Sequence, residues 1–197
     1  MQGALFTQLA ACVAMLGVSI AVSEAGAQFQ EPAQSDVYYY FDAVTGSISP
    51  LEMQVTKVMT KNYLFVVEGG YELAGGRSSF RIKSGQEQEF LIRLAPAFEG
   101  IREHGFTLKD YVFLTAASAR KDRRKIITVR WPLAGTPSIN ENKIPCDVKA
   151  YGDASVLIVP HEPLPAGEYA FMFSAPEYNS PRQQAFFAFG IDSASKN

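Results

Sequence analysis

The highest concentration of charge in the sequence lies between residues 120 and 125. The basic side chains of this segment are Arg120, Lys121, Arg123, Arg124 and Lys125. One interpretation is a solvated hairpin tip, whose charges keep a strand edge from pairing with other chains. The other is a contact for an anionic partner, such as lipopolysaccharide, a cell-wall polymer or an acidic protein face. Asp122 dilutes the positive charge, and both interpretations stay open at this point.

Side chains suited to metal chemistry are scattered along the chain. His104 and His161 are far apart, and neither stands in a spacing typical of zinc ligands, such as HExxH. Met53, Met59 and Met172 offer soft sulfur atoms for monovalent copper. Methionine on a strand more commonly fills a core, however. We therefore expect no metal site and no cofactor.

Motifs for nucleophilic catalysis are weak. The SxxK pattern occurs at 118–121 and at 193–196, but it is short and frequent by chance. Its β-lactamase setting requires a helix together with SDN and KTG elements, which this sequence lacks. A GxSxG nucleophile elbow is also missing from the sequence. We therefore expect that the protein is not an enzyme.

The first 27 residues are typical of a secretory signal peptide. The apolar segment Ala10–Val22 is too short to span a bilayer, and Ala-Gly-Ala at 25–27 forms a cleavage pattern. A retained membrane anchor is one alternative. Lipidation of Cys12 is another, because residues 9–12 read Leu-Ala-Ala-Cys. Cleavage before Gln28 predicts a periplasmic or secreted protein with no membrane span.

Composition limits the expected partners. Removing 27 of the 197 residues leaves 170, enough to bury one large core without disulfides or metals. Cys146 is then the only cysteine, and we interpret it as a buried, inert thiol; a reactive or intermolecular cysteine is the alternative. The formal charge of −2 gives no long-range reason to expect nucleic acid or an anionic membrane as partner. An envelope protein or polysaccharide is the expected partner.

Short apolar runs, several of them with period-two alternation, are separated by glycine and proline breaks and predict antiparallel strands. The runs fall at 37–41, 51–55, 63–67, 78–83, 89–94, 111–117, 125–131, 144–149, 155–159, 168–174 and 185–190. Residues 118–124 are expected to form a polar hairpin tip, and 98–103 a short helix. The pattern favours an all-β, two-sheet antiparallel sandwich over residues 37–192, with an exposed leader at 28–36 and a flexible tail at 193–197.

The segment Leu164-Pro165-Ala166-Gly167-Glu168-Tyr169 resembles the tyrosine corner of Greek-key sandwiches of the immunoglobulin and fibronectin type. Leu164, Gly167 and Tyr169 match in spacing, and the proline is displaced by one residue. The resemblance implies an immunoglobulin-like sandwich in which the hydroxyl of Tyr169 bonds to upstream backbone. It implies nothing about activity.

Two further resemblances are to exported bacterial proteins. Residues 76–81, 90–94 and 166–171 resemble segments of small uncharacterised secreted bacterial proteins, and no activity follows from this. Residues 163–169 resemble a stretch of the periplasmic copper-resistance sandwich family, which binds copper through histidines near its mature amino terminus. The corresponding histidines are missing here, so that function does not transfer.

These observations favour a non-enzymatic interaction or structural module of the cell envelope. The alternative is a periplasmic carrier of a small molecule or metal, which would need a pocket instead of a surface. The aromatic residues Tyr38 and Tyr40 could form an exposed strip that binds sugar or protein. Burial between two sheets would explain them equally well.

Overall fold

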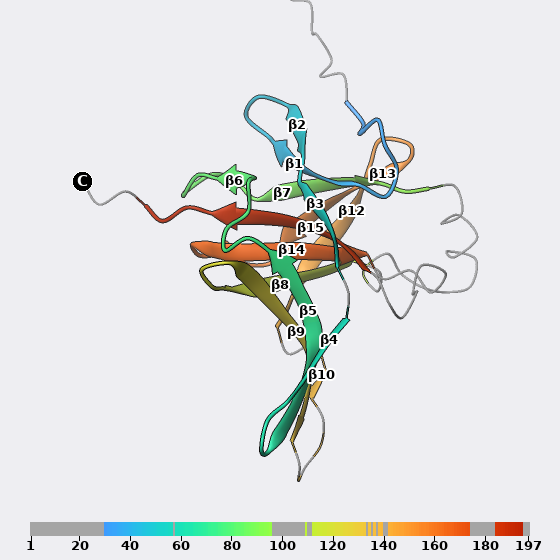
Figure 1. Cartoon of the computed structure of the whole chain (residues 1–197). Coiled ribbons are helices and arrows are strands. Elements are labelled where there is room, and N and C mark those ends of the chain that lie inside the picture. The colour runs from blue at the N-terminus through green and yellow to red at the C-terminus, as the bar shows by residue number, and fades with distance from the viewer. Residues whose placement is uncertain are drawn as a thin grey trace, which may run out of the picture.

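The structure is a computed structural model that describes residues 30–56, 58–95, 109, 112–132, 134, 136, 138–139, 142–173 and 184–194. The predicted signal peptide at 1–27, the predicted helix at 98–103 and His104 lie outside these residues. So does Cys12, together with the last three residues of the predicted tail. The fold is nearly all β, as predicted, and it consists of two sheets (Figure 1).

The smaller sheet is antiparallel and has the strand order β12-β13-β7-β1-β2 among the described residues. Its strands are β1 (Tyr38–Asp42), β2 (Ser47–Pro50), β7 (Glu89–Arg93), β12 (Cys146–Tyr151) and β13 (Ser155–Pro160). β1 and β2 form a hairpin, whereas β7 lies between β1 and β13, which are far apart in sequence.

The larger sheet has the order β3-β15-β14-β8-β9-β5-β4. These strands are β3 (Glu52–Thr56), β4 (Val58–Asn62), β5 (Val66–Ala74), β8 (Val112–Ala119), β9 (Arg123–Pro132), β14 (Gly167–Phe173) and β15 (Gln184–Ile191). Three two-residue strands attach to it: β6 (Arg81–Ile82) on β15, β10 (Ser138–Ile139) on β9 and β11 (Lys143–Ile144) on β8. The pairing of β6 with β15 is parallel, and the other named pairings are antiparallel.

The core lies between the two sheets and is rich in aromatic rings. Tyr38 of β1 stacks on Phe171 of β14, with ring centroids 4.5 Å apart, and Phe90 of β7 lies 4.7 Å from Phe189 of β15. Each pair joins one sheet to the other, which confirms the predicted sandwich. Tyr38 and Tyr40 are buried here, so the exposed aromatic strip considered from the sequence does not exist.

One end of the larger sheet projects from the sandwich as an arm made of β4, β5 and β9 (Figure 1). The sequence predicts a simple hairpin of 111–117 with 125–131. Instead, β8 and β9 pair only through Ser118 with Lys125 and Ala119 with Arg124. β9 pairs with β5 along its whole length, from Arg123 opposite Ala74 to Pro132 opposite Val66.

The pairing of β5 with β9 contains a bulge, in which Thr128 is the extra residue of β9. The register between β5 and β9 shifts between Gly69 and Gly70. A Cβ atom added to Gly70 would lie 2.0 Å from the carbonyl oxygen of Ile126, so β9 approaches the backbone more closely there than any side chain permits.

Candidate functional site

The basic segment does not form one exposed cluster. β9 begins at Arg123, so that only Arg120, Lys121 and Asp122 remain in the hairpin turn. Arg124 is 0% exposed and Lys125 is 8% exposed, which corrects the prediction that both lie on the surface for a partner. The exposed members are Arg120 and Lys121, and their contact with an anionic partner stays a prediction.

Arg124 is buried because ionic and backbone partners surround its guanidinium. Its Nη2 donates to Glu52 Oε1 at 2.7 Å and to the carbonyl of Ala74 at 2.9 Å. Its Nε donates to Gly75 O, and its Nη1 lies 3.7 Å from Glu168 Oε2. A buried charge is tolerated only with such pairing. The side chain therefore ties β9 to β3 and β14.

Glu52 is the centre of this network. Burial alone would raise the pKa of its carboxyl, but hydrogen bonds from Ser78, Arg124 and the backbone of Ser79 outweigh burial and lower the pKa to about 2. The carboxylate is thus charged at all physiological pH values. Its acceptor sites are occupied by structural partners, so the network stabilises the fold and has no proton to exchange.

The remaining basic residues of β9 belong to a charged face on the arm. Glu68 lies between Lys125 Nζ at 2.5 Å and Arg130 Nη2 at 3.2 Å. Glu72 lies between Lys61 Nζ at 2.5 Å and Arg123 Nη1 at 3.5 Å. We define the charged face by these residues, which are Lys61, Glu68, Glu72, Arg123, Lys125 and Arg130.

The predicted corner residue Tyr169 is buried, and its hydroxyl donates to the carbonyl of Pro165 at 2.8 Å. This confirms the bond to upstream backbone. The ring packs close to Gly167, where a Cβ atom would lie 3.3 Å from the hydroxyl oxygen. Leu164 is buried in the core beside it, and the amide of Gln88 exchanges two hydrogen bonds with the backbone of Leu164.

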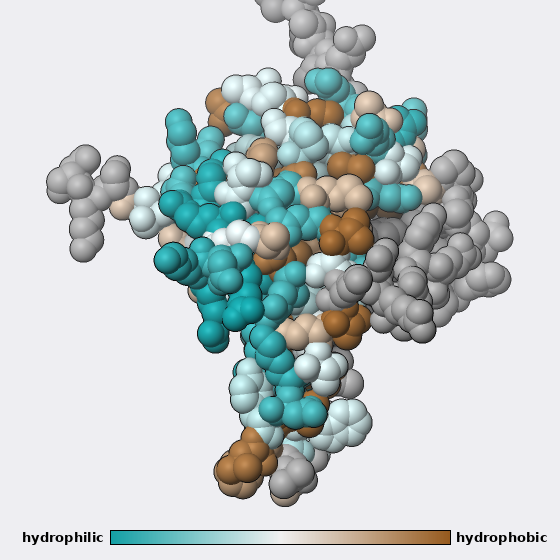
Figure 2. All heavy atoms as spheres, viewed as in Figure 1, coloured by the Kyte–Doolittle hydropathy of each residue, from teal (hydrophilic) through white to brown (hydrophobic). Residues whose placement is uncertain are grey.

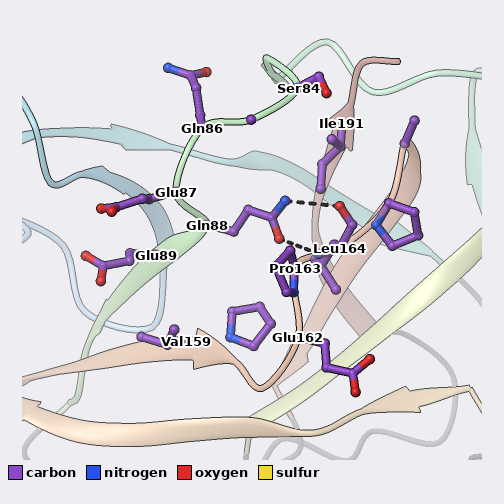
Figure 3. Close-up of a pocket in the computed structure, with 14 residues that line it drawn as sticks. Ser84, Gln86, Glu87, Gln88, Glu89, Val159, Glu162, Pro163, Leu164 and Ile191 are labelled. Carbon is purple, nitrogen blue, oxygen red and sulfur yellow. Dashed lines mark hydrogen bonds between the residues drawn. The ribbon is translucent and has the colours of Figure 1, made fainter. Parts of the chain in front are cut away.

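A groove of about 670 Å³ lies next to the corner, between the 84–89 segment and the 159–166 connector (Figure 3). Its central polar side chain, Gln88, is occupied by its bonds to Leu164. Glu87 and Glu89 lie on one side of the groove and Glu162 on the other, so these three carboxylates do not converge (Figure 3).

Of the two histidines, His161 lies within the described residues. His161 Nε2 lies 3.2 Å from Asp147 Oδ1 in an exposed loop. Within the described ranges, His, Cys, Asp and Glu side chains form no group of three or more able to hold a metal ion. Burial raises the pKa of the Cys146 thiol to about 11, consistent with an unreactive, half-buried cysteine. Met53 is exposed and therefore does not fill the core.

The largest departure from the sequence prediction lies at the end of the arm. Residues 63–67 were expected to form a strand, but Tyr63–Phe65 form the turn between β4 and β5. The N–H of Tyr63 donates to Val66 O at 2.7 Å, and Val66 N donates back to Tyr63 O at 3.4 Å. Leu64 and Phe65 are consequently the two central residues of a tight hairpin turn.

The side chains of this turn are directed into solvent. Tyr63 is 53% exposed, Leu64 82% and Phe65 67%. Val67 and Trp131 face one another across β5 and β9 just behind the turn, and Trp131 is 57% exposed. We define the apolar tip as Tyr63, Leu64, Phe65, Val67 and Trp131. Apolar side chains are visible at the lower end of the arm in Figure 2.

The two sides of the arm differ in chemistry. Val67 and Glu68 are neighbours in β5, and Trp131 and Arg130 are neighbours in β9, so the members of each pair point to opposite faces. Val67 and Trp131 therefore lie opposite the charged face. Sequence reasoning missed this surface because a five-residue apolar run is also what a buried strand looks like.

Comparison with models of known protein families, with curated proteins and with solved structures found no match. The resemblance to immunoglobulin-like domains therefore stays a prediction. In the part of the chain that the structure describes, helices of the length and hydrophobicity needed to cross a bilayer are not found.

Proposed function

We propose that the protein is a non-enzymatic interaction module of the cell envelope, which binds its partner through the apolar tip of the arm. The observation that carries this proposal is the exposure of Leu64 and Phe65 at the end of a projecting hairpin. An apolar cluster in water is costly to maintain, and such clusters commonly mark binding sites. Export to the periplasm or the medium is part of the proposal and rests on the pattern of residues 1–27.

Folding does not account for the apolar tip. Two-residue hairpin turns favour Asn, Asp and Gly, because these residues suit the turn backbone and are well solvated. Leu64 and Phe65 fulfil neither condition, and their side chains make little contact with the core. Binding supplies a reason for two large apolar residues at this position.

The alternative, a periplasmic small-molecule carrier, is supported by the groove beside the tyrosine corner. Its volume of about 670 Å³ falls in the range of ligand pockets. Its polar centre, however, is used to hold Leu164 in place, and its carboxylates do not point to a common centre. The apolar tip therefore supports an interaction module better than the groove supports a carrier.

Binding to envelope fragments tests the proposal. The protein is purified from the cells that produce it, in the form that accumulates after export. It is mixed with envelope fragments that retain membrane, protein and polymer, and the fragments with any bound protein are then sedimented. The substitution pair Leu64→Asp with Phe65→Asp should lower the bound fraction at least about tenfold, because it removes the burial of two large apolar side chains. Val44→Asp is the matched control, since Val44 is 90% exposed in the β1–β2 turn. Equal binding by all three proteins would reject the proposal.

A further inference from the structure

We infer that the partner of the apolar tip is an anionic lipid surface, into whose interfacial layer the tip inserts. This inference rests on the proposed function and names the chemistry of its partner. Three features of the arm favour such a partner: the shape of its end, the distribution of its charges and the types of its aromatic residues.

The first feature is shape. Leu64 and Phe65 occupy the β4–β5 turn at the end of an arm that projects from the sandwich, so apolar atoms cover a protruding turn (Figures 1 and 2). A protruding end can enter a deformable layer without a preformed cavity on the other side. Lys61 stands three positions before Leu64, which places its backbone at most about 10 Å behind the turn. Interfacial segments bury their apolar atoms about 5–10 Å deep in the lipid layer. Lys61 would therefore lie at the level of the headgroups when the turn is inserted.

The second feature is charge. The charged face contains three partly exposed cations, Lys61, Arg123 and Arg130, together with the buried Lys125 and two carboxylates, Glu68 and Glu72. Each carboxylate already has two cationic neighbours, so this face carries a formal excess of two positive charges. The whole chain has a net charge of −2. The arm is therefore locally positive although the chain as a whole is negative, and an anionic headgroup layer would attract the arm.

The third feature is the kind of aromatic residue behind the turn. Tyr63 and Trp131 each combine a large apolar ring with one polar group, and both are more than half exposed. Such residues favour the boundary between hydrocarbon and headgroups. The ammonium group of Lys125 lies 5.7 Å from the centre of the Tyr63 ring, which joins the apolar tip to the charged face. From the end of the arm inwards, the side chains are thus first apolar, then amphipathic and then cationic, as in a segment that binds at a membrane interface.

Trp131 provides the readout for the test, because it is the single tryptophan of the chain. The protein purified in the form that accumulates after export is titrated with vesicles of phosphatidylglycerol and phosphatidylcholine. Tryptophan emission should shift to the blue, and the protein should sediment with the vesicles. Leu64→Asp with Phe65→Asp should weaken the apparent affinity at least about tenfold, whereas Val44→Asp should leave it unchanged. Vesicles of pure phosphatidylcholine, or added salt, should weaken binding by the wild-type protein.

Three outcomes would overturn the inference: no blue shift with the wild-type protein, equal binding by the Leu64→Asp, Phe65→Asp variant, or equal binding to neutral and anionic vesicles. Leu64→Ser with Phe65→Ser serves as the second variant if the aspartate pair fails to fold. Tip-dependent binding to envelope fragments from which lipid has been extracted would also overturn it, while leaving the proposed function intact. Loss of tip dependence in both assays would remove both claims.

Discussion

At the scale of single residues, removing the hydroxyl group should have opposite effects on stability at two buried tyrosines. The hydroxyl of Tyr169 donates to Pro165 O, whereas the hydroxyl of Tyr38 has no hydrogen-bond partner among the described residues. Both rings belong to the core between the sheets. The effect of replacing each tyrosine with phenylalanine on the free energy of unfolding should therefore depend on whether its hydroxyl makes a hydrogen bond.

Tyr169→Phe should lower the free energy of unfolding by about 1 kcal/mol, the net value of a typical intramolecular hydrogen bond. The ring keeps its stacking on Phe189, so the effect reports the corner bond alone. Urea denaturation measures it. An unchanged midpoint would show that the corner bond contributes nothing to stability.

Tyr38→Phe should act in the other direction. Burial raises the pKa of the Tyr38 hydroxyl, and its oxygen is removed from water without a partner, which costs free energy. Replacing it with hydrogen should raise the free energy of unfolding by about 1 kcal/mol. The same urea experiment decides this, and a clear loss of stability would mean that the hydroxyl has a partner after all.

At the scale of elements, the arm depends on the close approach of β5 and β9 at the bulge of β9. A methyl group at Gly70 would meet the backbone carbonyl of Ile126 at 2.0 Å, and a backbone atom cannot rotate away. Gly70→Ala should therefore cost about 2 kcal/mol, as overpacked sites do. Gly69→Ala is the matched control, because its Cβ would lie 3.7 Å from Val129 Cβ, an ordinary contact. Similar denaturation midpoints for the two variants would contradict the close approach of β9.

The buried ion pair between β3 and β9 predicts a pH dependence. Interactions with Ser78 and Arg124 lower the pKa of Glu52 from its ordinary value of 4.5 to about 2, against the opposing effect of burial. A lowered pKa in the folded state stabilises the protein above pH 4.5, and this stabilisation is lost as the pH falls towards 2. Glu52→Gln should cost about 3 kcal/mol at neutral pH, because Arg124 then lacks its nearest counter-charge.

A comparison of the wild-type protein with the Glu52→Gln variant at several pH values provides the control for that prediction. Thermal unfolding of the wild-type protein and of Glu52→Gln is followed between neutral and acidic pH. The difference between them should narrow as the pH falls below 4.5, because Glu52 of the unfolded chain takes up a proton near pH 4.5 and the folded carboxyl does so only near pH 2. A constant difference across this range would mean that the charge of Glu52 is not what stabilises the interface of β3 and β9.

At the scale of the whole molecule, the local sequence patterns predicted the sandwich but not its surface. The apolar run at 155–159 and the period-two alternation at 185–190 correctly predicted strands, and the corner motif correctly placed Tyr169. Arg124 was misplaced because its counter-charge, Glu52, is 72 residues away in sequence, and only the fold brings them together. The apolar tip was misread because apolar composition does not distinguish a buried strand from an exposed turn.

The most direct test of the central claim is site-specific photo-crosslinking. A photoreactive phenylalanine analogue is placed at Phe65 in one variant and at Val44 in another, and both are irradiated in intact cells. The account predicts an adduct of higher mass from position 65, to lipid or to another envelope component, and none from position 44. Both side chains are exposed to solvent, so their reactivity toward water is comparable. Absence of an adduct at position 65, or equal adducts at both positions, would contradict the assignment of the apolar tip as the binding surface.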